Sequence, residues 1–220
     1  MTARGELAMI KVCEIFAGIQ GESTLQGLPT VFVRLTGCNL NCRFCDTPYA
    51  REDGIELTVE EVISRIKKFY LTYVCVTGGE PLLQKETLTL ADKLVNQGLT
   101  VSVETNGTFD VSVLNVKVIR VIDIKCPGSG EHGKTHPANI AHPGQNTEYK
   151  FVVGGREDFE YARDFVRNHG LGAARALLLS PVTGELEPKQ LAEWIIAEMP
   201  ESRLQIQLHK VIWPDEIRGR

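Results

Sequence analysis

The sequence predicts an α/β fold whose parallel sheet forms a partial, incomplete βα barrel. Apolar runs rich in β-branched residues alternate along the chain with segments of helical period. Strands that are apolar throughout and separated by helices indicate βα units and a parallel sheet covered by helices. Eight complete βα units need about 250 residues. This chain has 220 residues, and some of its connections lack a helix, so a partial barrel is expected.

The expected strands coincide with the apolar runs that favour extended backbone. In chain order they are Met9–Phe16, Thr30–Thr36, Tyr73–Thr77, Thr100–Glu104, Val118–Ile124, Glu148–Val153, Arg175–Leu179 and Leu204–Gln207.

Helices are expected around Thr58–Tyr70, Lys85–Gln97, Arg156–His169 and Pro188–Met199. The first begins with Thr58-x-x-Glu61, a capping box in which side chains and backbone amides bond reciprocally. The second and third end near Gly98 and Gly170, where glycine adopts a left-handed cap most easily. The fixed φ of Pro188 suits the first turn of the last helix.

The sequence contains no linker that would mark a domain boundary, so residues 1–220 are expected to form a single domain with a short C-terminal tail, 211–220. The stretch from Cys126 to Thr147 is rich in Gly, Pro and His and has no period. Loops of this length in compact domains are usually functional or mobile.

Composition restricts the class of protein. A hydrophobic fraction of 43% and a charged fraction of 24% are ordinary for a soluble globular protein. The net charge of −4 argues against a nucleic-acid-binding protein. No apolar run approaches the ~20 residues of a membrane helix, and the N-terminus MTARGELAMIK is too polar for a secretory signal. A cytoplasmic protein without membrane association is expected.

Three of the six cysteines are close enough in sequence to share a metal centre: Cys38, Cys42 and Cys45, spaced CxxxCxxC directly after an expected strand. Cys13 and Cys75 lie in apolar, β-branched runs, where a free cysteine behaves as a small core residue.

Iron–sulfur clusters are usually held by four cysteines, so three would leave one iron of a 4Fe–4S cluster open to another ligand. Cys126 could be a fourth ligand, but its distance in sequence and the proline after it favour a structural role. A closed zinc site also needs four ligands. His132, His136 and His142 could supply the fourth, so zinc remains an alternative.

This cysteine motif resembles that of the radical S-adenosylmethionine (SAM) enzymes. The resemblance implies a radical SAM type of partial barrel and a cluster loop, residues 37–50, that holds a 4Fe–4S cluster. In that superfamily the open iron binds the methionine group of SAM, and one electron then cleaves SAM to a 5′-deoxyadenosyl radical. The radical forms on SAM, so no catalytic protein side chain is expected.

The same resemblance implies SAM contacts at the ends of three successive strands, where α/β folds place ligands. Glu80 would lie against the SAM amino group and Glu104 against the ribose. The full set of expected SAM-binding residues is Phe44, Thr77, Gly78, Gly79, Glu80, Glu104, Asp123, Lys125 and Ser129.

Longer stretches resemble the 7-carboxy-7-deazaguanine synthase (QueE) family along nearly the whole chain. They include Gln20-Gly21-Glu22, Arg34-Leu-Thr-Gly-Cys38, Asp46-Thr47 and Gln207-Leu-His209-Lys210. The resemblance implies a carbon–nitrogen lyase that uses SAM catalytically, together with Mg²⁺. Such an enzyme contracts the ring of 6-carboxy-5,6,7,8-tetrahydropterin to 7-carboxy-7-deazaguanine with loss of ammonia, on the route to queuosine.

For that substrate, Arg34 offers bidentate pairing to the pterin carboxylate, and the resemblance assigns Thr47 as the Mg²⁺ ligand. Amide, carboxylate and imidazole groups supply the donors and acceptors that read a pterin edge. The expected substrate-binding residues are Gln20, Gly21, Glu22, Arg34, Thr77, Gln207 and His209.

Two alternative functions stay open at this point: a radical SAM enzyme that activates glycyl-radical enzymes, and a non-catalytic zinc-binding module. The family resemblance also implies a homodimer and a flavodoxin-type electron donor.

Overall fold

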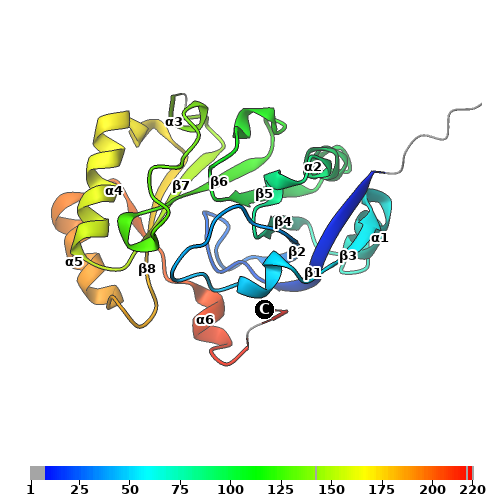
Figure 1. Ribbon diagram of the computed structural model, residues 1–220, viewed down its shortest axis with the longest axis horizontal. Helices are drawn as coiled ribbons and strands as arrows, with labels where there is room; N and C mark the ends of the chain where they lie inside the picture. Colours follow the sequence, from blue (N-terminus) through cyan, green and yellow to red (C-terminus); the bar gives the residue numbers. More distant parts are fainter. Residues whose placement is uncertain (1–7, 142, 217, 220) are drawn as a thin grey trace, which may run out of the picture.

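The computed structural model describes residues 8–141, 143–216, 218 and 219. They contain a nine-stranded sheet with the order β3-β1-β2-β4-β5-β6-β7-β8-β9. Neighbours from β2 to β9 are parallel, whereas β1 runs antiparallel to both β2 and β3. The sheet curves without closing (Figure 1), which confirms the expected partial barrel.

The strands are β1 Met9–Ile19, β2 Pro29–Leu35, β3 Ile55–Thr58, β4 Tyr73–Gly78, β5 Thr100–Thr105, β6 Ile119–Ile124, β7 Thr147–Val153, β8 Ala176–Pro181 and β9 Arg203–Leu204. The α-helices are α1 Val59–Lys67, α2 Glu86–Asn96, α3 Ala138–Ala141, α4 Arg156–His169, α5 Pro188–Glu198 and α6 Leu208–Ile212. Short 3₁₀ turns are η1 Pro48–Arg51, η2 Pro81–Leu83, η3 Val111–Val113, η4 Pro127–Ser129 and η5 Leu171–Ala173.

The expected helices and strands are all present; α4 has the expected ends, and each of the others is shifted at one end or both. The last strand is shorter than expected, because β9 ends at Leu204. Three elements were not predicted: the edge strand β3, the short helix α3 inside the expected loop, and α6 after β9. Each is at most five residues long and therefore too short to show a clear period.

The helix ends follow the predicted chemistry. The Thr58 side chain accepts a hydrogen bond from the Glu61 amide, and the Glu61 side chain accepts one from the Thr58 amide. Gly170 adopts a left-handed φ of 62° after α4, and Pro188 begins α5. None of the described helices combines the length and apolarity needed to cross a lipid bilayer.

The two faces of the sheet carry different side chains because residues alternate along a strand. The outer face packs against α1, α2, α4 and α5 (Figure 1), and it contributes residues such as Val33 and Val76 to the main core. Next to them, Arg34 and Thr77 are register partners whose side chains face the inner, concave side. The cluster loop and α6 cover this side (Figure 1).

Candidate active site

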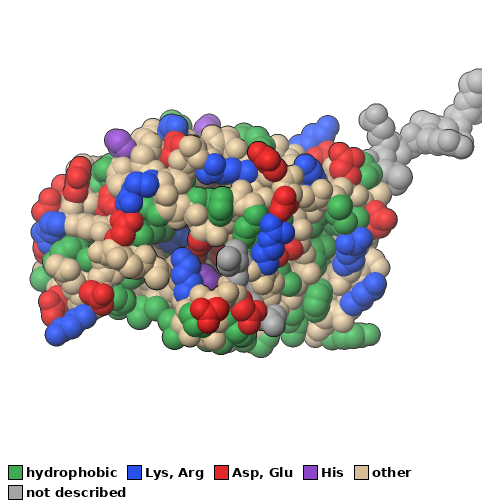
Figure 2. Space-filling view, turned by 60° about the horizontal axis from the view of Figure 1, so that its bottom comes forward, with side chains coloured by type: hydrophobic (Ala, Val, Ile, Leu, Met, Phe, Trp, Pro, Cys, Tyr) green, Lys and Arg blue, Asp and Glu red, His purple; other side chains and the backbone are tan. Residues whose placement is uncertain are grey.

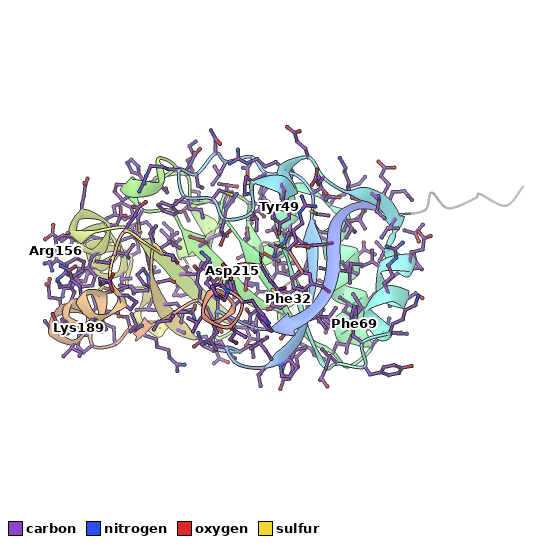
Figure 3. All side chains as sticks on the ribbon, turned by 90° about the horizontal axis from the view of Figure 1, so that it is seen from below. Phe32, Tyr49, Phe69, Arg156, Lys189 and Asp215 are labelled. Atoms are coloured by element: carbon purple, nitrogen blue, oxygen red, sulfur yellow. The ribbon has the colours of Figure 1, made fainter. Side chains whose placement is uncertain are left out.

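A cavity of about 620 Å³ lies on the concave side, at the carboxyl ends of the central strands. Figure 2 shows the molecule hollowed near its centre, with acidic, basic and histidine side chains around the opening. In the view from below, Tyr49, Phe32 and Asp215 lie in the middle of the molecule, and Arg156, Lys189 and Phe69 lie toward its two ends (Figure 3).

The structure brings most of the expected site residues together around this cavity. Those that line it are Gln20, Glu22, Arg34, Cys38, Cys42, Phe44, Cys45, Thr47, Thr77, Gly78, Gly79, Glu104, Asp123, Lys125, Gln207 and His209. Gly21, Glu80 and Ser129 are not part of its lining.

The cluster loop presents Cys38, Cys42 and Cys45 to the cavity and is fixed at several points. The Asn41 amide donates to the Glu131 carboxylate at 2.7 Å, and the Arg43 amide donates to the Ser129 carbonyl at 3.0 Å. The Arg43 guanidinium also forms a bidentate pair with Glu185, at 2.7 and 2.8 Å. The loop is thus held between the β6–β7 and β8–α5 connections.

The donor set of this loop suits an iron–sulfur cluster with one open iron. Three thiols line the cavity, whereas Cys126 is 1% exposed and its Sγ lies 3.9 Å from the Ile124 carbonyl. Among the described residues, no group of three or more His, Cys, Asp or Glu side chains is placed to hold a single metal ion. His132 and His136 do not line the cavity, and His142 is outside the described residues.

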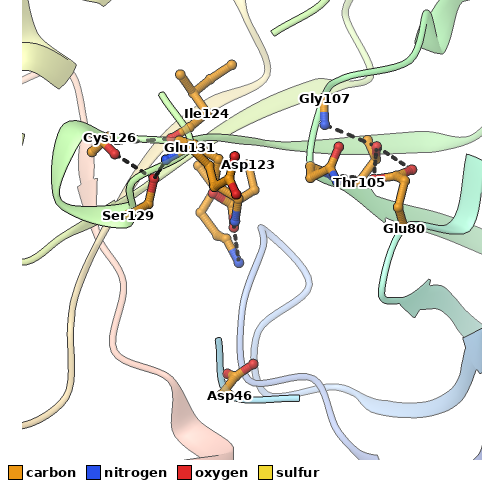
Figure 4. Close-up of polar contacts among 12 residues, drawn as sticks. Asp46, Glu80, Thr105, Gly107, Asp123, Ile124, Cys126, Ser129 and Glu131 are labelled. Atoms are coloured by element: carbon orange, nitrogen blue, oxygen red, sulfur yellow. Dashed lines mark hydrogen bonds and ion pairs between the residues drawn. The ribbon is translucent and has the colours of Figure 1, made fainter. Parts of the chain in front are cut away.

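Ser129 supports the loop from behind. Its hydroxyl donates to the Cys126 carbonyl at 2.6 Å and accepts from the Glu131 amide at 3.0 Å (Figure 4). Ser129 is 1% exposed, and these two hydrogen bonds of its hydroxyl stabilise the turn that carries Glu131. The other cysteines also agree with the sequence analysis in part: Cys75 is buried in the core, while Cys13 is partly exposed.

Gly78 and Gly79 are required by the close approach of two protein segments. A Cβ on Gly78 would lie 2.2 Å from the Leu35 carbonyl oxygen, and Gly78 has a φ of 146°. A Cβ on Gly79 would lie 2.1 Å from the Gly37 oxygen and 2.8 Å from the Cys38 Cβ. The glycine pair therefore lets the end of β4 pack directly against the start of the cluster loop.

Glu80 is 0% exposed, and its carboxylate binds the protein itself. It accepts hydrogen bonds from the Thr105 hydroxyl at 2.8 and 2.9 Å (Figure 4). It also accepts hydrogen bonds from the Asn106 amide at 2.7 Å and from the Leu82 amide at 2.8 Å. Burial raises the pKa of Glu80, although the amide hydrogen bonds act against this rise. Glu80 thus ties the β4 end to the β5 end.

A row of buried charges crosses the cavity floor. Lys150 on β7 lies 2.6 Å from a Glu22 oxygen and 3.4 Å from Asp123 Oδ2, and Lys125 lies 3.0 Å from the same Asp123 oxygen. Burial alone would lower the pKa of Lys150, but the surrounding carboxylates, Glu22 first, raise it well above its ordinary value. Lys150 is therefore an ammonium at neutral pH.

Glu104 lies beside these charges, and its pKa is shifted in the opposite direction to that of Glu22. Its Oε1 accepts a hydrogen bond from the Gln20 side chain at 3.2 Å. Burial, followed by the charge of Glu22, raises the pKa of Glu104. Burial also acts to raise the pKa of Glu22, but the charge and hydrogen bond of Lys150 lower it overall.

The Arg34 guanidinium is fixed through its Nε atom, which pairs with Glu14. Its Nε lies 2.6 Å from Glu14 Oε1, which also accepts a hydrogen bond from the Tyr49 hydroxyl at 3.0 Å. Burial would lower the pKa of Arg34, but Tyr49 and Glu14 raise it, and burial raises the pKa of Tyr49 to about 12. Arg34 also lines the cavity.

Thr47 and Asp46 follow Cys45 at the rim. Thr47 precedes η1, yet its side chain makes no capping hydrogen bond there. Asp46 Oδ2 lies 3.4 Å from the Lys210 ammonium, whose charge lowers the pKa of Asp46 against the effect of burial. A hydroxyl and a carboxylate therefore stand together beside the last cysteine.

The segment around α6 completes the wall opposite the strands. Gln207 donates a hydrogen bond to Glu22, and burial lowers the pKa of His209. Gly21 contributes by being small, since a Cβ there would lie 2.2 Å from His209 Nδ1. Gly21 thus allows His209 to reach the cavity beside Gln207.

The C-terminal segment passes over the same cavity. Trp213, Pro214 and Glu216 contribute to its lining. Farther along, the Arg218 guanidinium lies 4.1 Å from the centre of the Tyr49 ring and pairs with Asp53. The Gly219 amide donates to Glu14 Oε2 at 3.2 Å. The chain end therefore contacts both the cluster loop and β1.

Comparisons with known proteins agree with this geometry. The radical SAM superfamily pattern matches residues 32–122. The 7-carboxy-7-deazaguanine synthase of Chlorobaculum tepidum is 40% identical over 215 residues, which cover 96% of this chain and 98% of that protein. The chain belongs to the 7-carboxy-7-deazaguanine synthase family. Its relative in Methanospirillum hungatei, of the same name, is 40% identical over 92% of this chain and 85% of that protein.

A crystal structure of QueE from Escherichia coli has the same fold. It superposes with a TM-score of 0.77 at 23% identity and covers 90% of this chain and 94% of that one. This structure confirms the expected fold, and the superfamily match and the relatives above confirm the expected family. As a member of this family, the chain is a radical SAM lyase, and neither the activating enzyme nor the zinc module is supported.

Several residues that shape the site of this synthase-family member were not predicted. They are Glu14, Lys150, Glu131 and the C-terminal residues Trp213, Pro214 and Glu216. One signal was available for Lys150, a lone lysine in the otherwise largely apolar run Tyr149-Lys150-Phe151-Val152. A charge in a buried strand needs a partner, and such a residue is often functional.

Proposed function

We propose that this chain catalyses the ring contraction of 6-carboxy-5,6,7,8-tetrahydropterin to 7-carboxy-7-deazaguanine with loss of ammonia, using a 4Fe–4S cluster, SAM and Mg²⁺. The observation that carries the proposal is the meeting of two sets of residues in one cavity. Three cluster-loop thiols form one wall, and the polar side chains of Glu22, Gln207 and His209 form another. A volume of about 620 Å³ is within the range of small-molecule sites.

The polar side chains suit a carboxylated pterin. The Glu22 carboxylate, fixed by Lys150 and Gln207, would accept hydrogen bonds from the amino and ring N–H donors of the pterin. The Arg34 guanidinium, fixed by Glu14, would pair with the pterin carboxylate. His209, neutral because burial lowers its pKa, would supply one further donor or acceptor.

The cofactors would be held by other parts of the same lining. Cys38, Cys42 and Cys45 would hold the cluster, and the backbone at Gly78 and Gly79 would lie against SAM. Thr47 would provide a hard oxygen ligand for Mg²⁺. When bound, these groups supply the radical that removes a hydrogen from the pterin and the charge that assists its rearrangement. The protein side chains orient both molecules and exclude water.

Further contacts extend the proposal to the remaining site residues. Glu104, Asp123 and Lys125 would contact SAM from the ends of β5 and β6, together with Phe44 from the cluster loop. Gln20 and Thr77 would contact the pterin. We also expect a homodimer, reduction by a flavodoxin-type donor and a cytoplasmic location.

The test is an anaerobic assay on purified, iron- and sulfide-reconstituted protein. With SAM, Mg²⁺, a reductant and the tetrahydropterin, chromatography and mass spectrometry should detect 7-carboxy-7-deazaguanine. SAM should be consumed in less than stoichiometric amounts, because its use is catalytic. An intact cluster by absorption spectroscopy without this product would contradict the proposal.

Two cysteine variants provide the matched control. Cys42→Ser removes a thiol that lines the cavity and should abolish both the visible cluster absorption and the product. Cys13→Ser removes a thiol of β1 that does not line it and should retain both.

A further inference from the structure

Lys150 is a buried cation between segments that are distant in sequence. It lies on β7, and its side chain is 11% exposed. Its ammonium contacts Glu22, which follows β1, and Asp123, which lies on β6. All three side chains line the cavity.

Each carboxylate that Lys150 touches has a second fixed partner. Glu22 Oε1 accepts a hydrogen bond from Gln207, while Glu22 Oε2 contacts Lys150. Asp123 Oδ2 is shared between Lys150 and Lys125. Asp123 Oδ1 is buried and accepts no hydrogen bond from any described residue, so the ion pairs at Oδ2 are what fix this carboxylate.

Charge balance explains why a cation is needed at this point. Glu22, Glu104 and Asp123 converge on one cavity. Carboxylates that share a partly desolvated site repel one another, and one of them takes up a proton unless a cation stands between them. Lys125 lies next to Asp123. Lys150 contacts Glu22 and Asp123 together, so it keeps both ionised and in place.

We infer that Lys150 is a positioning residue that fixes Glu22 for the pterin and Asp123 for SAM, and so joins the two binding sites across the cavity floor. The inference rests on the proposed function for the nature of the two ligands. Lys150 acts through these carboxylates and has no part in the chemical step itself.

The test compares Lys150→Met, Lys150→Arg and wild-type protein as reconstituted holoenzymes. Equilibrium binding of the tetrahydropterin and of SAM is measured anaerobically, beside iron content and melting temperature. For Lys150→Met, the dissociation constant of the pterin should rise roughly 10- to 100-fold, because Glu22, which binds the pterin, loses its charged hydrogen bond from Lys150. The SAM constant should rise roughly 3- to 10-fold. Lys150→Arg keeps the charge and should recover part of both affinities.

A double variant separates positioning from folding. Lys150→Met leaves Glu22 buried beside no cation, which destabilises the fold, whereas Glu22→Gln with Lys150→Met removes both charges and should regain the melting temperature. Its pterin affinity should equal that of the Glu22→Gln single variant, measured alongside, since Lys150 acts through Glu22 and has no further effect once Glu22 is replaced. Lys93→Met, which breaks an exposed ion pair between Lys93 on α2 and Glu60 on α1, is the matched control and should bind as wild type does.

Three results would overturn the inference: unchanged affinities in Lys150→Met, additive losses in the double variant, or a double variant that neither folds nor holds iron. If wild-type protein binds SAM but no pterin, the proposed function fails. The SAM measurement then still decides the role of Lys150.

Discussion

Glu22 and Glu104 line the same cavity, yet their surroundings shift their pKa values in opposite directions. Burial acts to raise both, but Lys150 contacts Glu22 directly and lowers its pKa. Glu104 instead accepts a hydrogen bond from the neutral Gln20 amide and is exposed to the charge of Glu22. Two identical side chains therefore differ in their readiness to hold a proton, which is a common way to divide roles in an active site.

This difference predicts how stability depends on pH. The folded pKa of Glu104 lies above that of an unfolded glutamate, about 4.3. Its stabilising effect is then complete below about pH 4.3 and is lost as pH rises through the higher folded value. Glu104→Gln keeps a side-chain oxygen that accepts the hydrogen bond of Gln20. It removes the carboxyl group, so stability is no longer lost through its ionisation as the pH rises. Its melting temperature should exceed that of wild type at pH 8, by roughly 2–4 °C for each kcal/mol gained.

The difference in melting temperature between Glu104→Gln and wild type should disappear as the pH approaches about 4.3. Thermal unfolding followed by circular dichroism measures this difference. Glu193→Gln on the exposed side of α5 is the control and should show no such pH-dependent gain. A lower melting temperature for Glu104→Gln at pH 8 would contradict the assigned direction.

At the scale of single residues, the sequence predicted those whose spacing is itself the signal. The CxxxCxxC cysteines need only one loop to come together, and the structure brings them to one wall. Lys150 was missed because its partners, Glu22 and Asp123, are brought to it only by the order of strands in the sheet. Glu80 stays a predicted SAM contact, and the sequence could not show that Thr105 and Asn106 also donate hydrogen bonds to its carboxylate.

Among the elements, the turn after β4 combines two functions. Gly78 and Gly79 allow β4 to contact the cluster loop, and Glu80 ties the same turn to β5. The Gly79 amide donates to the Leu35 carbonyl at 3.2 Å, and the Glu80 amide donates to the Gly37 carbonyl at 2.7 Å. The position of Cys38 therefore depends on backbone contacts with a segment about forty residues away in sequence.

A methyl group at Gly79 should disrupt this arrangement. In Gly79→Ala the new Cβ would overlap the Gly37 oxygen and the Cys38 Cβ, and backbone cannot move away as a flexible side chain can. We expect a loss of about 3 kcal/mol in the free energy of unfolding, at the upper end for an overpacked site. We also expect less iron bound per chain after reconstitution.

Denaturant unfolding and iron analysis measure these two effects. Gly172→Ala is the matched control, because a Cβ at Gly172 meets no atom within 4 Å. Wild-type iron content and stability in Gly79→Ala would show that the contact between the two segments is not needed.

Whether a helix or strand was predicted correctly depended on its length. Helix α4, with fourteen residues and a left-handed Gly170 cap, was predicted with its correct ends. The four residues of β3 gave no periodic signal, and their pairing with β1 is a tertiary contact. Helix α6 has five residues and is placed by neighbours such as Gly21. Short elements of this kind are fixed by the rest of the fold.

For the molecule as a whole, the two faces of the sheet divide stability from function. The outer face packs against the long helices and forms the main core. The concave face is covered by the cluster loop, α6 and the C-terminal segment, which Figure 1 shows on the open side of the curved sheet. Because the sheet is not closed, this side leaves room for the cavity of about 620 Å³.

The C-terminal segment should matter for binding more than for folding. In a chain that ends at Ile212, the cavity loses Trp213, Pro214 and Glu216, and the contact of Arg218 with Tyr49 is absent. The outer core does not involve these residues. We expect the melting temperature to change little, while the KM for the pterin rises roughly tenfold, equivalent to about 1.4 kcal/mol.

Steady-state kinetics and thermal unfolding of the shortened chain measure these effects. Arg218→Ala alone should give a smaller increase in KM, because Trp213 remains in the lining. Unchanged KM in the shortened chain would show that the segment takes no part in substrate binding.

The contacts of the glycine turn also bear on how the enzyme matures. They join protein backbone to protein backbone and include no metal ligand, unlike the contacts of a zinc finger, which folds only on its metal. Cys45 is exposed to solvent, which leaves the loop open to delivery from outside. We therefore expect that the cluster can be built into the folded chain, and that a cluster destroyed by oxygen can be replaced without a new round of folding.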